Sequence, residues 1–253
     1  MPIASILIPV YNHEKYIARA VMSALNQTVT DIEVVIVDNK SMDNTFEICQ
    51  ELAIKDSRII LVQNHTNIGP VKNWKKAAEL ANSNFSKLLF SDDYIHPTFL
   101  EKTLPHLIKP NCSFVYTTVN IGIEDSYTVK YRPFIGDTKI LRDSYIYWAT
   151  YYGGGVFPYS PCSCISRTAD LKRNLHTNIP GFESSEYEIT GAGVDWLFHP
   201  LTALTYEYVQ FIDEPLVFFE AHGSNLTTHP ACASLYSNAK NFVLSRIIGA
   251  VNS

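Results

Sequence analysis

The pattern of apolar and polar residues is most regular over residues 1–93. Short apolar runs, each as long as a buried strand, occupy residues 5–10, 33–38, 59–62 and 87–91. Between these runs the apolar side chains recur every three or four positions, which is typical of helices with one buried face. We expect the third helix to open at Pro70, since proline suits the first turn of a helix. The alternation predicts a parallel sheet with helices on its faces.

The pattern is less regular after residue 93. A helix ending near Lys109 and a strand over 113–118 are predicted next, and the stretch from about 122 to 163 is rich in tyrosine, proline and glycine. The later predicted elements are a helix over 192–203, strands over 207–212 and 215–219, and a tail helix over 233–251. The tail helix either packs on the domain or lies on a membrane surface, although Lys240 and Arg246 are its only cations.

Acidic residues stand where two of the predicted strands end. Asp38 closes the run over 33–38, and the doublet Asp92-Asp93 follows the run over 87–91. Ligands bind at the carboxyl edge of open α/β sheets. Carboxylates at this edge are explained by a divalent cation that carries a charged ligand. The alternative is that these residues merely cap turns or helix starts, where Asp is common.

The sheet lacks both common phosphate-binding signatures. Neither Gly-x-Gly-x-x-Gly after the first strand nor Gly-x-x-x-x-Gly-Lys-Ser/Thr occurs, and Pro9-Val10-Tyr11-Asn12 stands at the first position instead. This argues against a dinucleotide-dependent oxidoreductase and against a P-loop NTPase. A diphosphate bound without a glycine cradle needs another source of positive charge, which a metal held by carboxylates supplies.

Composition narrows the class further. The chain has 20 basic and 25 acidic residues and a formal net charge of −5, which argues against a general nucleic-acid binder. We expect a cytoplasmic protein, because no basic leader precedes the first strand and no apolar stretch approaches the ~20 residues of a membrane span. The 5 cysteines show no disulfide spacing and are interpreted as reduced structural thiols, with a metal fragment at Cys162-Ser163-Cys164 as the alternative.

Several motifs, in order along the chain, resemble glycosyltransferase family 2. The motifs are the segments at residues 5–12, 24–28, 33–45, 67–69 and 91–97, with looser matches at 181–182, 194–196 and 222–224. The resemblance implies the GT-A fold, with a Rossmann-like, mostly parallel sheet and a C-terminal acceptor-side lobe. It also implies an inverting enzyme that uses nucleotide-sugars.

The resemblance assigns nucleotide contacts to the first part of the chain. Asp38 is expected to accept a hydrogen bond from the base, typically uracil, and Asp92 to lie near the ribose or the metal. The other expected nucleotide contacts are Pro9, Val10, Tyr11, Glu14, Asn67 and Lys72. Lys72 would reach a phosphate, although most lysines on a helix are solvated.

The resemblance places the metal and the catalytic base as well. Asp93, with Asp92, would bind Mn²⁺ or Mg²⁺, and His222 stands where family members often contact the metal or the diphosphate. Asp195 matches the acidic residue taken as catalytic base. The chain departs from the family pattern at Phe90, where members often carry the first acid of the metal motif. Only two carboxylates therefore remain in that motif.

The expected activity is transfer of a sugar from a UDP-sugar, or a dTDP- or GDP-sugar, to a saccharide or lipid-linked saccharide. The setting would be bacterial surface polysaccharide or lipopolysaccharide synthesis, with peripheral membrane association as an option. Residues 1–118 would bind the nucleotide-sugar, residues 119–232 would bind the acceptor and catalyse transfer, and residues 233–253 would form a C-terminal helix.

Two other classes stay open at this point. A sugar nucleotidyltransferase also combines an α/β sheet with Mg²⁺, but it needs a glycine-rich basic loop after the first strand. A non-catalytic nucleotide- or saccharide-binding module is the other alternative. The aromatic residues over 145–159 either belong to the core or line a sugar-binding cleft.

Overall fold

The structure is a computed structural model that describes residues 1–123, 126–151, 157, 160–221 and 231–251. Its first part alternates strands and helices as predicted. The elements are β1 (Ala4–Val10), α1 (Ile17–Leu25), β2 (Ile32–Asp38), α2 (Thr45–Lys55), β3 (Ile59–Gln63), α3 (Pro70–Leu80), β4 (Phe85–Leu88), β5 (Tyr94–Ile95) and α4 (Phe99–Leu107). Helix α3 opens at Pro70, as its sequence predicts.

The second part contains longer strands and a cluster of helices. The elements are β6 (Cys112–Ile123), β7 (Ser126–Lys130), β8 (Thr138–Leu141), α5 (Arg142–Tyr151), the 3₁₀ helix η2 (Pro161–Ser163), β9 (Cys164–Arg167), α6 (Thr168–Asn174), α7 (Glu186–Thr190), α8 (Val194–Ala203), β10 (Tyr208–Glu220) and α9 (Cys232–Val251). The cysteines are buried free thiols, which confirms the structural interpretation.

The described strands form one sheet of 10 strands in the order β3-β2-β1-β4-β9-β6-β10-β5, with β7 beside β6 and β8 beside β10. Strands β3, β2, β1 and β4 run parallel to one another, and β9 is antiparallel to both β4 and β6. Strand β10 is parallel to β6. The predicted α/β class is therefore confirmed, and the antiparallel strands lie mostly in the part that the sequence pattern left undefined.

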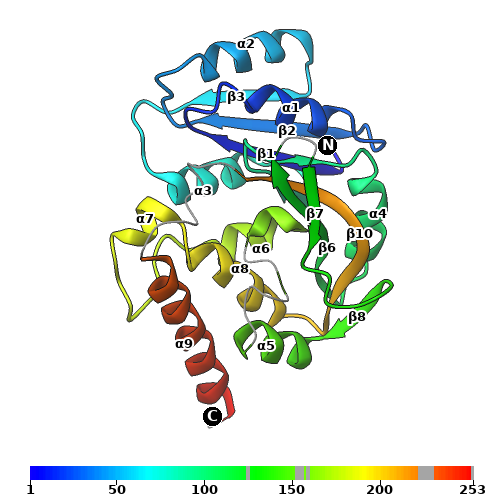
Figure 1. The fold of residues 1–253 in the computed structure, drawn as a ribbon, viewed down its shortest axis with the longest axis vertical. Coiled ribbons are helices and arrows are strands. Elements are labelled where there is room, and N and C mark those ends of the chain that lie inside the picture. The colour runs from blue at the N-terminus through cyan, green and yellow to red at the C-terminus, as the bar shows by residue number, and fades with distance from the viewer. Residues whose placement is uncertain (124–125, 152–156, 158–159, 222–230, 252–253) are drawn as a thin grey trace.

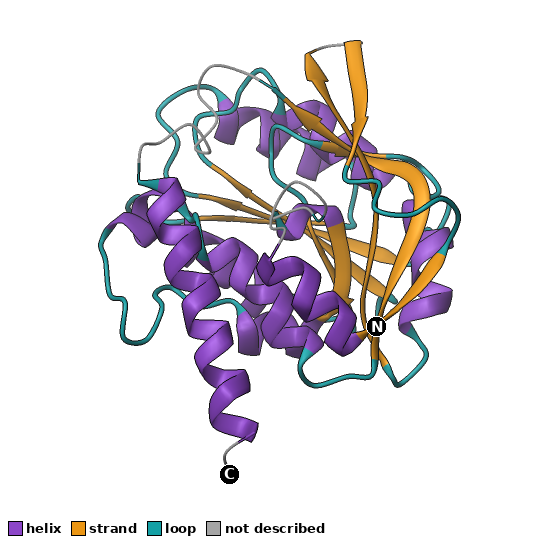
Figure 2. Ribbon diagram, turned by 60° about the horizontal axis from the view of Figure 1, so that its bottom comes forward, coloured by secondary structure: helices purple, strands orange, loops and turns teal. Residues whose placement is uncertain are grey.

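Helices cover both faces of this sheet, as Figures 1 and 2 show. Helices α1, α2 and α4 pack on one face through residues such as Ile17, Cys49 and Phe99. Helices α3, α5, α6 and α8 pack on the other face, and α9 joins the same core. The alternate side chains of β1 divide accordingly, since Ile6 and Ile8 face the first layer and Leu7 faces the second.

Three strands differ from the prediction by more than one residue. The strand predicted over 113–118 is longer and covers Cys112–Ile123. The fourth strand covers Phe85–Leu88 rather than 87–91. Leu89 is buried although it lies beyond the strand. An apolar run indicates which residues are buried, but it does not show which of them pair with a neighbouring strand. The strands predicted over 207–212 and 215–219 are one strand, β10, whose register shifts at Pro215. Proline cannot donate a ladder hydrogen bond, so the irregularity falls there.

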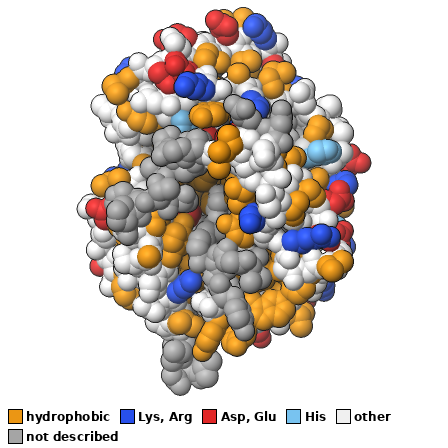
Figure 3. Space-filling model, in the orientation of Figure 1, with side chains coloured by type: hydrophobic (Ala, Val, Ile, Leu, Met, Phe, Trp, Pro, Cys, Tyr) orange, Lys and Arg blue, Asp and Glu red, His pale blue; other side chains and the backbone are white. Residues whose placement is uncertain are grey.

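The tail helix α9 packs on the domain. Leu235, Ala239, Phe242 and Val243 are buried against the core that includes α8. In the described part of the chain, no helix is both long and apolar enough to cross a membrane. Figure 3 shows acidic and basic side chains interspersed over one face of the molecule.

Candidate functional site

Asp38 is the last residue of β2 and is fully buried. Its Oδ2 accepts hydrogen bonds from the Ser41 backbone N–H at 3.1 Å and from the Gln63 side-chain amide at 3.0 Å. Its Oδ1 is buried and has no hydrogen-bond partner among the described residues. Buried polar atoms are nearly always paired, so an unpaired carboxylate oxygen at this sheet edge indicates a place for a ligand donor.

The loops after β1 and β2 are tied to one another. The Asn12 backbone N–H donates to Ser41 Oγ at 2.9 Å, and Asn12 Oδ1 accepts from the Met42 backbone N–H at 2.8 Å. The Glu14 carboxylate accepts from the backbone and side chain of Asn44, at 3.0 and 2.8 Å. These bonds hold the two loops as one unit beside Asp38. Glu14, which was predicted to contact the nucleotide, therefore connects these two loops in the structure.

The other predicted nucleotide contacts near the first loop differ in how deeply they are buried. Pro9 and Val10 are the buried last residues of β1, and Val10 is the register partner of Asp38. Tyr11 is partly exposed at the start of the loop. The structure thus brings Pro9, Val10 and Tyr11 to the same edge as Asp38.

Asn67 joins this edge through the neighbouring loop. Its Oδ1 accepts from the Asn39 side-chain amide at 2.8 Å and from the Gly69 backbone N–H at 2.9 Å. A pocket of about 470 Å³ lies beside it, lined by Asn67, Ile68, Gly69, Pro70, Lys72, Glu188 and Ile189. Lys72 Nζ lies 3.0 Å from Glu188 on α7. The pocket therefore contains both Asn67 and Lys72 and lies between α3 and α7.

The Asp92-Asp93 doublet lies in the turn between β4 and β5, and the end of β10 holds it in place. Asp93 Oδ1 accepts from the Glu220 backbone N–H at 3.1 Å. Arg19 Nη2 donates to the Asp92 carbonyl at 2.9 Å and to Glu220 Oε2 at 2.8 Å. The Tyr127 hydroxyl also donates to Glu220 Oε2, at 3.1 Å. Glu220, which is only 5% exposed, therefore connects both acids to the sheet.

Electrostatics at the doublet favour a cation. Burial raises the pKa of Asp93 well above its usual range, and the nearby Asp92 carboxylate raises it further. Lys87 is fully buried, donates to the Cys162 carbonyl, and opposes the rise in the pKa of Asp93. A divalent cation bound to Asp93 would favour the ionised carboxylate that burial penalises.

The donor set fits a metal that also takes ligands from a diphosphate. Mg²⁺ is usually bound through one or two carboxylates together with substrate phosphates, and the doublet supplies two carboxylates. No group of three or more possible ligands from His, Cys, Asp and Glu occurs within the described residues. His222, the third predicted ligand, lies outside them.

Asp195 occupies the first turn of α8, as predicted. Its Oδ1 accepts from the Trp196 backbone N–H at 2.7 Å, and its Oδ2 accepts from the Tyr236 hydroxyl on α9 at 2.9 Å. Burial raises the pKa of Asp195 to about 7, against the opposing effect of these hydrogen bonds. A carboxyl group with a pKa near neutrality suits a general base.

Comparison with known proteins places these features in a family. Residues 5–173 match the family model described as Glycosyl transferase family 2, which is more than half of the chain. The chain belongs to this family. The family model therefore agrees with the sequence motifs that resemble this family, and the glycosyltransferase class is confirmed.

Curated relatives of this glycosyltransferase match a little less than half of it. A chondroitin synthase of Escherichia coli is 41% identical over 120 residues, which are 47% of this chain and 17% of the relative. The putative teichuronic acid biosynthesis glycosyltransferase TuaG of Bacillus subtilis is 34% identical over 124 residues, which are 49% of each chain. The glycosyltransferase thus spans less than half the length of each of these relatives.

A solved structure extends the likeness to the whole fold. The S. aureus TarS 1–349 fragment in complex with UDP-GlcNAc superposes with a TM-score of 0.75 at 22% identity, over 98% of this chain and 67% of that one. At this identity the match shows the fold alone. The GT-A fold expected from the sequence is confirmed.

Four residues of this site escaped the sequence analysis. His13 Nδ1 lies 2.7 Å from Ser91 Oγ, which connects the loop after β1 to the residue before the doublet. Arg19 and Glu220 support the doublet, and Tyr236 contacts Asp195. Arg19 lies within a helical apolar pattern and Tyr236 lies in the predicted tail, so neither carried a local signal of a site.

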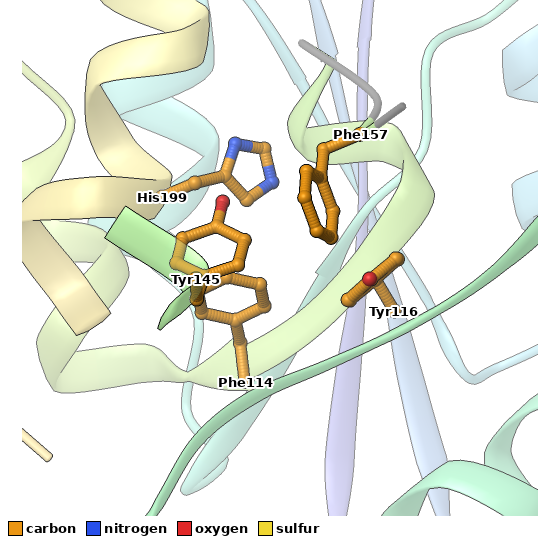
Figure 4. A pocket seen from close by; sticks show the side chains of 5 residues that line it. All are labelled: Phe114, Tyr116, Tyr145, Phe157 and His199. Carbon is orange, nitrogen blue, oxygen red and sulfur yellow. The ribbon is translucent and has the colours of Figure 1, made fainter. Parts of the chain in front are cut away.

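The aromatic residues of the glycosyltransferase divide between core and surface. Tyr145 is buried with Phe114, Phe157 and His199 around a void too small for a water molecule (Figure 4). By contrast, Tyr147 and Tyr151 are 51% and 73% exposed and stack on each other at 5.0 Å. Tyr152 and residues 153–155, which belong to the same predicted stretch, lie outside the described residues.

His199 is a core residue of this aromatic cluster. It is 1% exposed, and neither ring nitrogen makes a hydrogen bond of ordinary geometry among the described residues. Burial lowers the pKa of His199 to about 3, although the Trp196 backbone acts in the opposite direction. The imidazole is therefore neutral at physiological pH and packs as an aromatic ring between Phe114 and Phe198.

Proposed function

We propose that this glycosyltransferase is an inverting, metal-dependent enzyme that moves a sugar from a UDP-sugar to a saccharide acceptor. The observation that carries the proposal is the buried Oδ1 of Asp38, which has no hydrogen-bond partner in the described part of the chain and lies at a sheet edge shared with Pro9, Val10, Tyr11 and Asn67. This oxygen would accept a hydrogen bond from an N–H of a base such as uracil. The UDP-GlcNAc and UDP complexes of the TarS fragment support a uridine nucleotide.

Asp92 and Asp93 would hold Mn²⁺ or Mg²⁺, and the cation would supply Lewis acidity to the leaving diphosphate. Arg19 and Glu220 keep the two acids in place, and Lys72 would leave Glu188 to bind a phosphate. His222 is a further candidate ligand. Because burial raises the pKa of Asp93, the proton on this carboxyl would leave when a cation binds.

Asp195 would act as the general base. The acceptor hydroxyl would give its proton to the Asp195 carboxylate while the hydroxyl oxygen attacks the anomeric carbon. The attack occurs opposite the leaving diphosphate, so the configuration inverts. A base of this kind contributes about 10²–10⁴-fold to the rate.

The donor sugar is proposed to be a hexose or an N-acetylhexosamine, and the acceptor a saccharide or a lipid-linked saccharide. The TarS complex contains an N-acetylhexosamine donor, and the names of the relatives concern chondroitin and teichuronic acid. We propose that the protein acts in bacterial surface polysaccharide synthesis at the cytoplasmic side of the membrane. Residues 1–118 would bind the donor, and residues 119–232 would bind the acceptor.

A donor screen tests this proposal. The protein is incubated with Mn²⁺ and each of several UDP-, dTDP- and GDP-sugars, with and without oligosaccharide acceptors, and nucleotide diphosphate release is measured. We expect release from a UDP-sugar that depends on the cation, with a product of inverted anomeric configuration by NMR coupling constants. Formation of a nucleotide-sugar from a nucleoside triphosphate and a sugar 1-phosphate would instead indicate a nucleotidyltransferase. Tight UDP binding without any turnover would indicate a binding module.

A further inference from the structure

The tail helix α9 supplies a side chain to the candidate base. Tyr236 comes from the second turn of α9, and its hydroxyl donates to Asp195 Oδ2 at 2.9 Å. The other oxygen of Asp195 accepts from the Trp196 backbone N–H. The carboxylate is therefore held at both oxygens, once by its own helix and once by α9.

The packing between α8 and α9 leaves little freedom at this contact. Gly193 precedes α8 with φ of 85°, and a Cβ atom there would lie 2.6 Å from the Leu235 carbonyl oxygen. Leu235 and Ala239 are buried on either side of Tyr236 along the helix. A side chain at position 193 would push α9 away, so the glycine permits the approach that brings Tyr236 to Asp195.

We infer that Tyr236 is a positioning residue, whose hydroxyl fixes the rotation of the Asp195 carboxylate and makes α9 a part of the catalytic site. This inference rests on the proposed role of Asp195 as the base. One lone pair of each oxygen is used by these bonds, which leaves lone pairs for an acceptor hydroxyl. The tail helix then completes the site as well as covering the core.

The bond has a measurable electrostatic consequence. A hydrogen bond donated to a carboxylate favours its ionised form. Around Asp195 the largest influences on its pKa are burial, which raises it, and the Tyr236 hydroxyl and the N–H groups at the start of α8, which lower it. On α7, which also packs against α9, the Tyr187 hydroxyl accepts a hydrogen bond from the Asn238 side-chain amide at 3.3 Å, and the other titratable residues of α7 are Glu186 and Glu188. Loss of the Tyr236 hydroxyl alone should therefore raise the pKa of Asp195.

The first test compares the variants Y236F and N238A in the full chain. Both remove one hydrogen bond made by α9, but only Y236F removes the bond to Asp195. The pH dependence of kcat and of kcat/KM is measured with the donor found in the screen. For Y236F we expect the acidic limb of the pH–rate profile to move to higher pH by about one unit. As a result, kcat should fall about fivefold at pH 7 and recover toward pH 9. The donor KM should stay unchanged, and N238A should keep the wild-type limb.

A loss of activity of equal size at every pH in Y236F would overturn the inference, since a merely structural effect behaves in that way. A shift of the limb in N238A equal to that in Y236F would overturn it too. Turnover by D195N with wild-type kcat would overturn both the base assignment and the inference. In that case the donor screen would still stand as evidence for a transferase.

The second test does not depend on activity. The unfolding equilibria of wild type, Y236F, D195N and the double variant are measured by urea denaturation at pH 5 and pH 8.5. Because Tyr236 favours the charged carboxylate, Y236F should raise the unfolding equilibrium constant about tenfold more at pH 8.5 than at pH 5. In the D195N background this pH dependence should vanish. Its persistence there would overturn the inference even if the protein transferred no sugar.

Discussion

In the half proposed to bind the donor the acids stand at or just after the ends of strands, whereas in the half proposed to catalyse transfer the acid stands at the start of a helix. Asp38 ends β2, and its surroundings are loops that bond to one another over short distances. Asp195 opens α8, and its second oxygen depends on α9, 41 positions further along the chain. The first kind of site is assembled locally by neighbouring parallel strands. The second kind exists only once two helices have docked.

The two halves also differ in what their buried carboxyl groups require. Asp93 is buried beside Asp92, so the ionised pair would need a cation to stabilise it. Asp195 is buried beside hydrogen-bond donors, and its pKa of about 7 lets it exchange a proton near neutral pH. On this basis the doublet would carry its full charge only with a bound cation, and Asp195 is suited to accept a proton.

The largest expected effect separates the two roles. D195N should lower kcat by about 10²–10⁴-fold, because the acceptor hydroxyl loses its base, while UDP affinity stays at the wild-type value. Stopped assays of UDP release and calorimetric UDP titration measure the two quantities. A fall in UDP affinity together with kcat would place Asp195 in the donor site and contradict the division.

The next effect concerns the doublet. D93N removes one of the two proposed carboxylate ligands. The Mn²⁺-dependent part of UDP binding should therefore weaken by at least about 10²-fold, the upper end of the effect of losing a residue that supports a ligand. Calorimetry with UDP, with and without Mn²⁺, measures it. D56N is the control, since Asp56 pairs with Arg58 before β3, away from the carboxyl edge. Equal UDP affinity of D93N and D56N in Mn²⁺ would refute metal binding at the doublet.

The core beneath the catalytic half should respond to pH. The pKa of His199 is about 3 in the folded protein, compared with 6.5 for a histidine in water, so below pH 6.5 only the unfolded chain takes up a proton there. The unfolding free energy should therefore fall as pH falls, by about 1.6 kcal/mol from this residue between pH 6.5 and 5. In H199F the part of this fall in unfolding free energy that is due to His199 should be absent, as measured by urea denaturation at the two pH values. An identical loss of stability in both proteins would contradict the assignment.

The smallest effect tests the support of the doublet. R19M removes the donor to the Asp92 carbonyl and to Glu220, and should weaken Mn²⁺-dependent UDP binding about tenfold. R58M, which breaks an ion pair of the same length, 2.8 Å, is the matched control and should bind as wild type. If R19M and R58M bound UDP equally well in Mn²⁺, the hydrogen bonds of Arg19 would not contribute to binding at the doublet.

Much of the donor half could be predicted from the chain alone. The apolar runs located β1, β2 and β3 to within a residue or two, and Asp38 fell at a strand end as expected. Strand β4 ended earlier than predicted, which placed the doublet in a turn rather than directly after a strand. The reason is that the period and length of apolar runs report burial, and burial continues through Leu89 after the ladder has ended.

The supporting residues could not be predicted in the same way. Arg19 and Glu220 are 201 positions apart, and an exposed-looking arginine on a helix carries no sign of its partner. In the sequence, Tyr236 does not differ from the other residues of the predicted tail helix. It contacts Asp195 only because α9 packs against α8. Strands β7, β8 and β9 were missed because short antiparallel strands in an aromatic stretch have no distinct period.

By itself the sequence determined the α/β order, the acids at the carboxyl edge, the family and the helix that begins beside Asp195. These depend on local spacing and on motifs of a few residues. The tertiary structure decided which oxygen of Asp38 has no partner among the described residues, how the doublet is held, and that the tail helix reaches Asp195. Such features arise when segments far apart in the chain exclude water together, because burial and hydrogen-bond pairing are properties of the assembled surroundings and not of a segment.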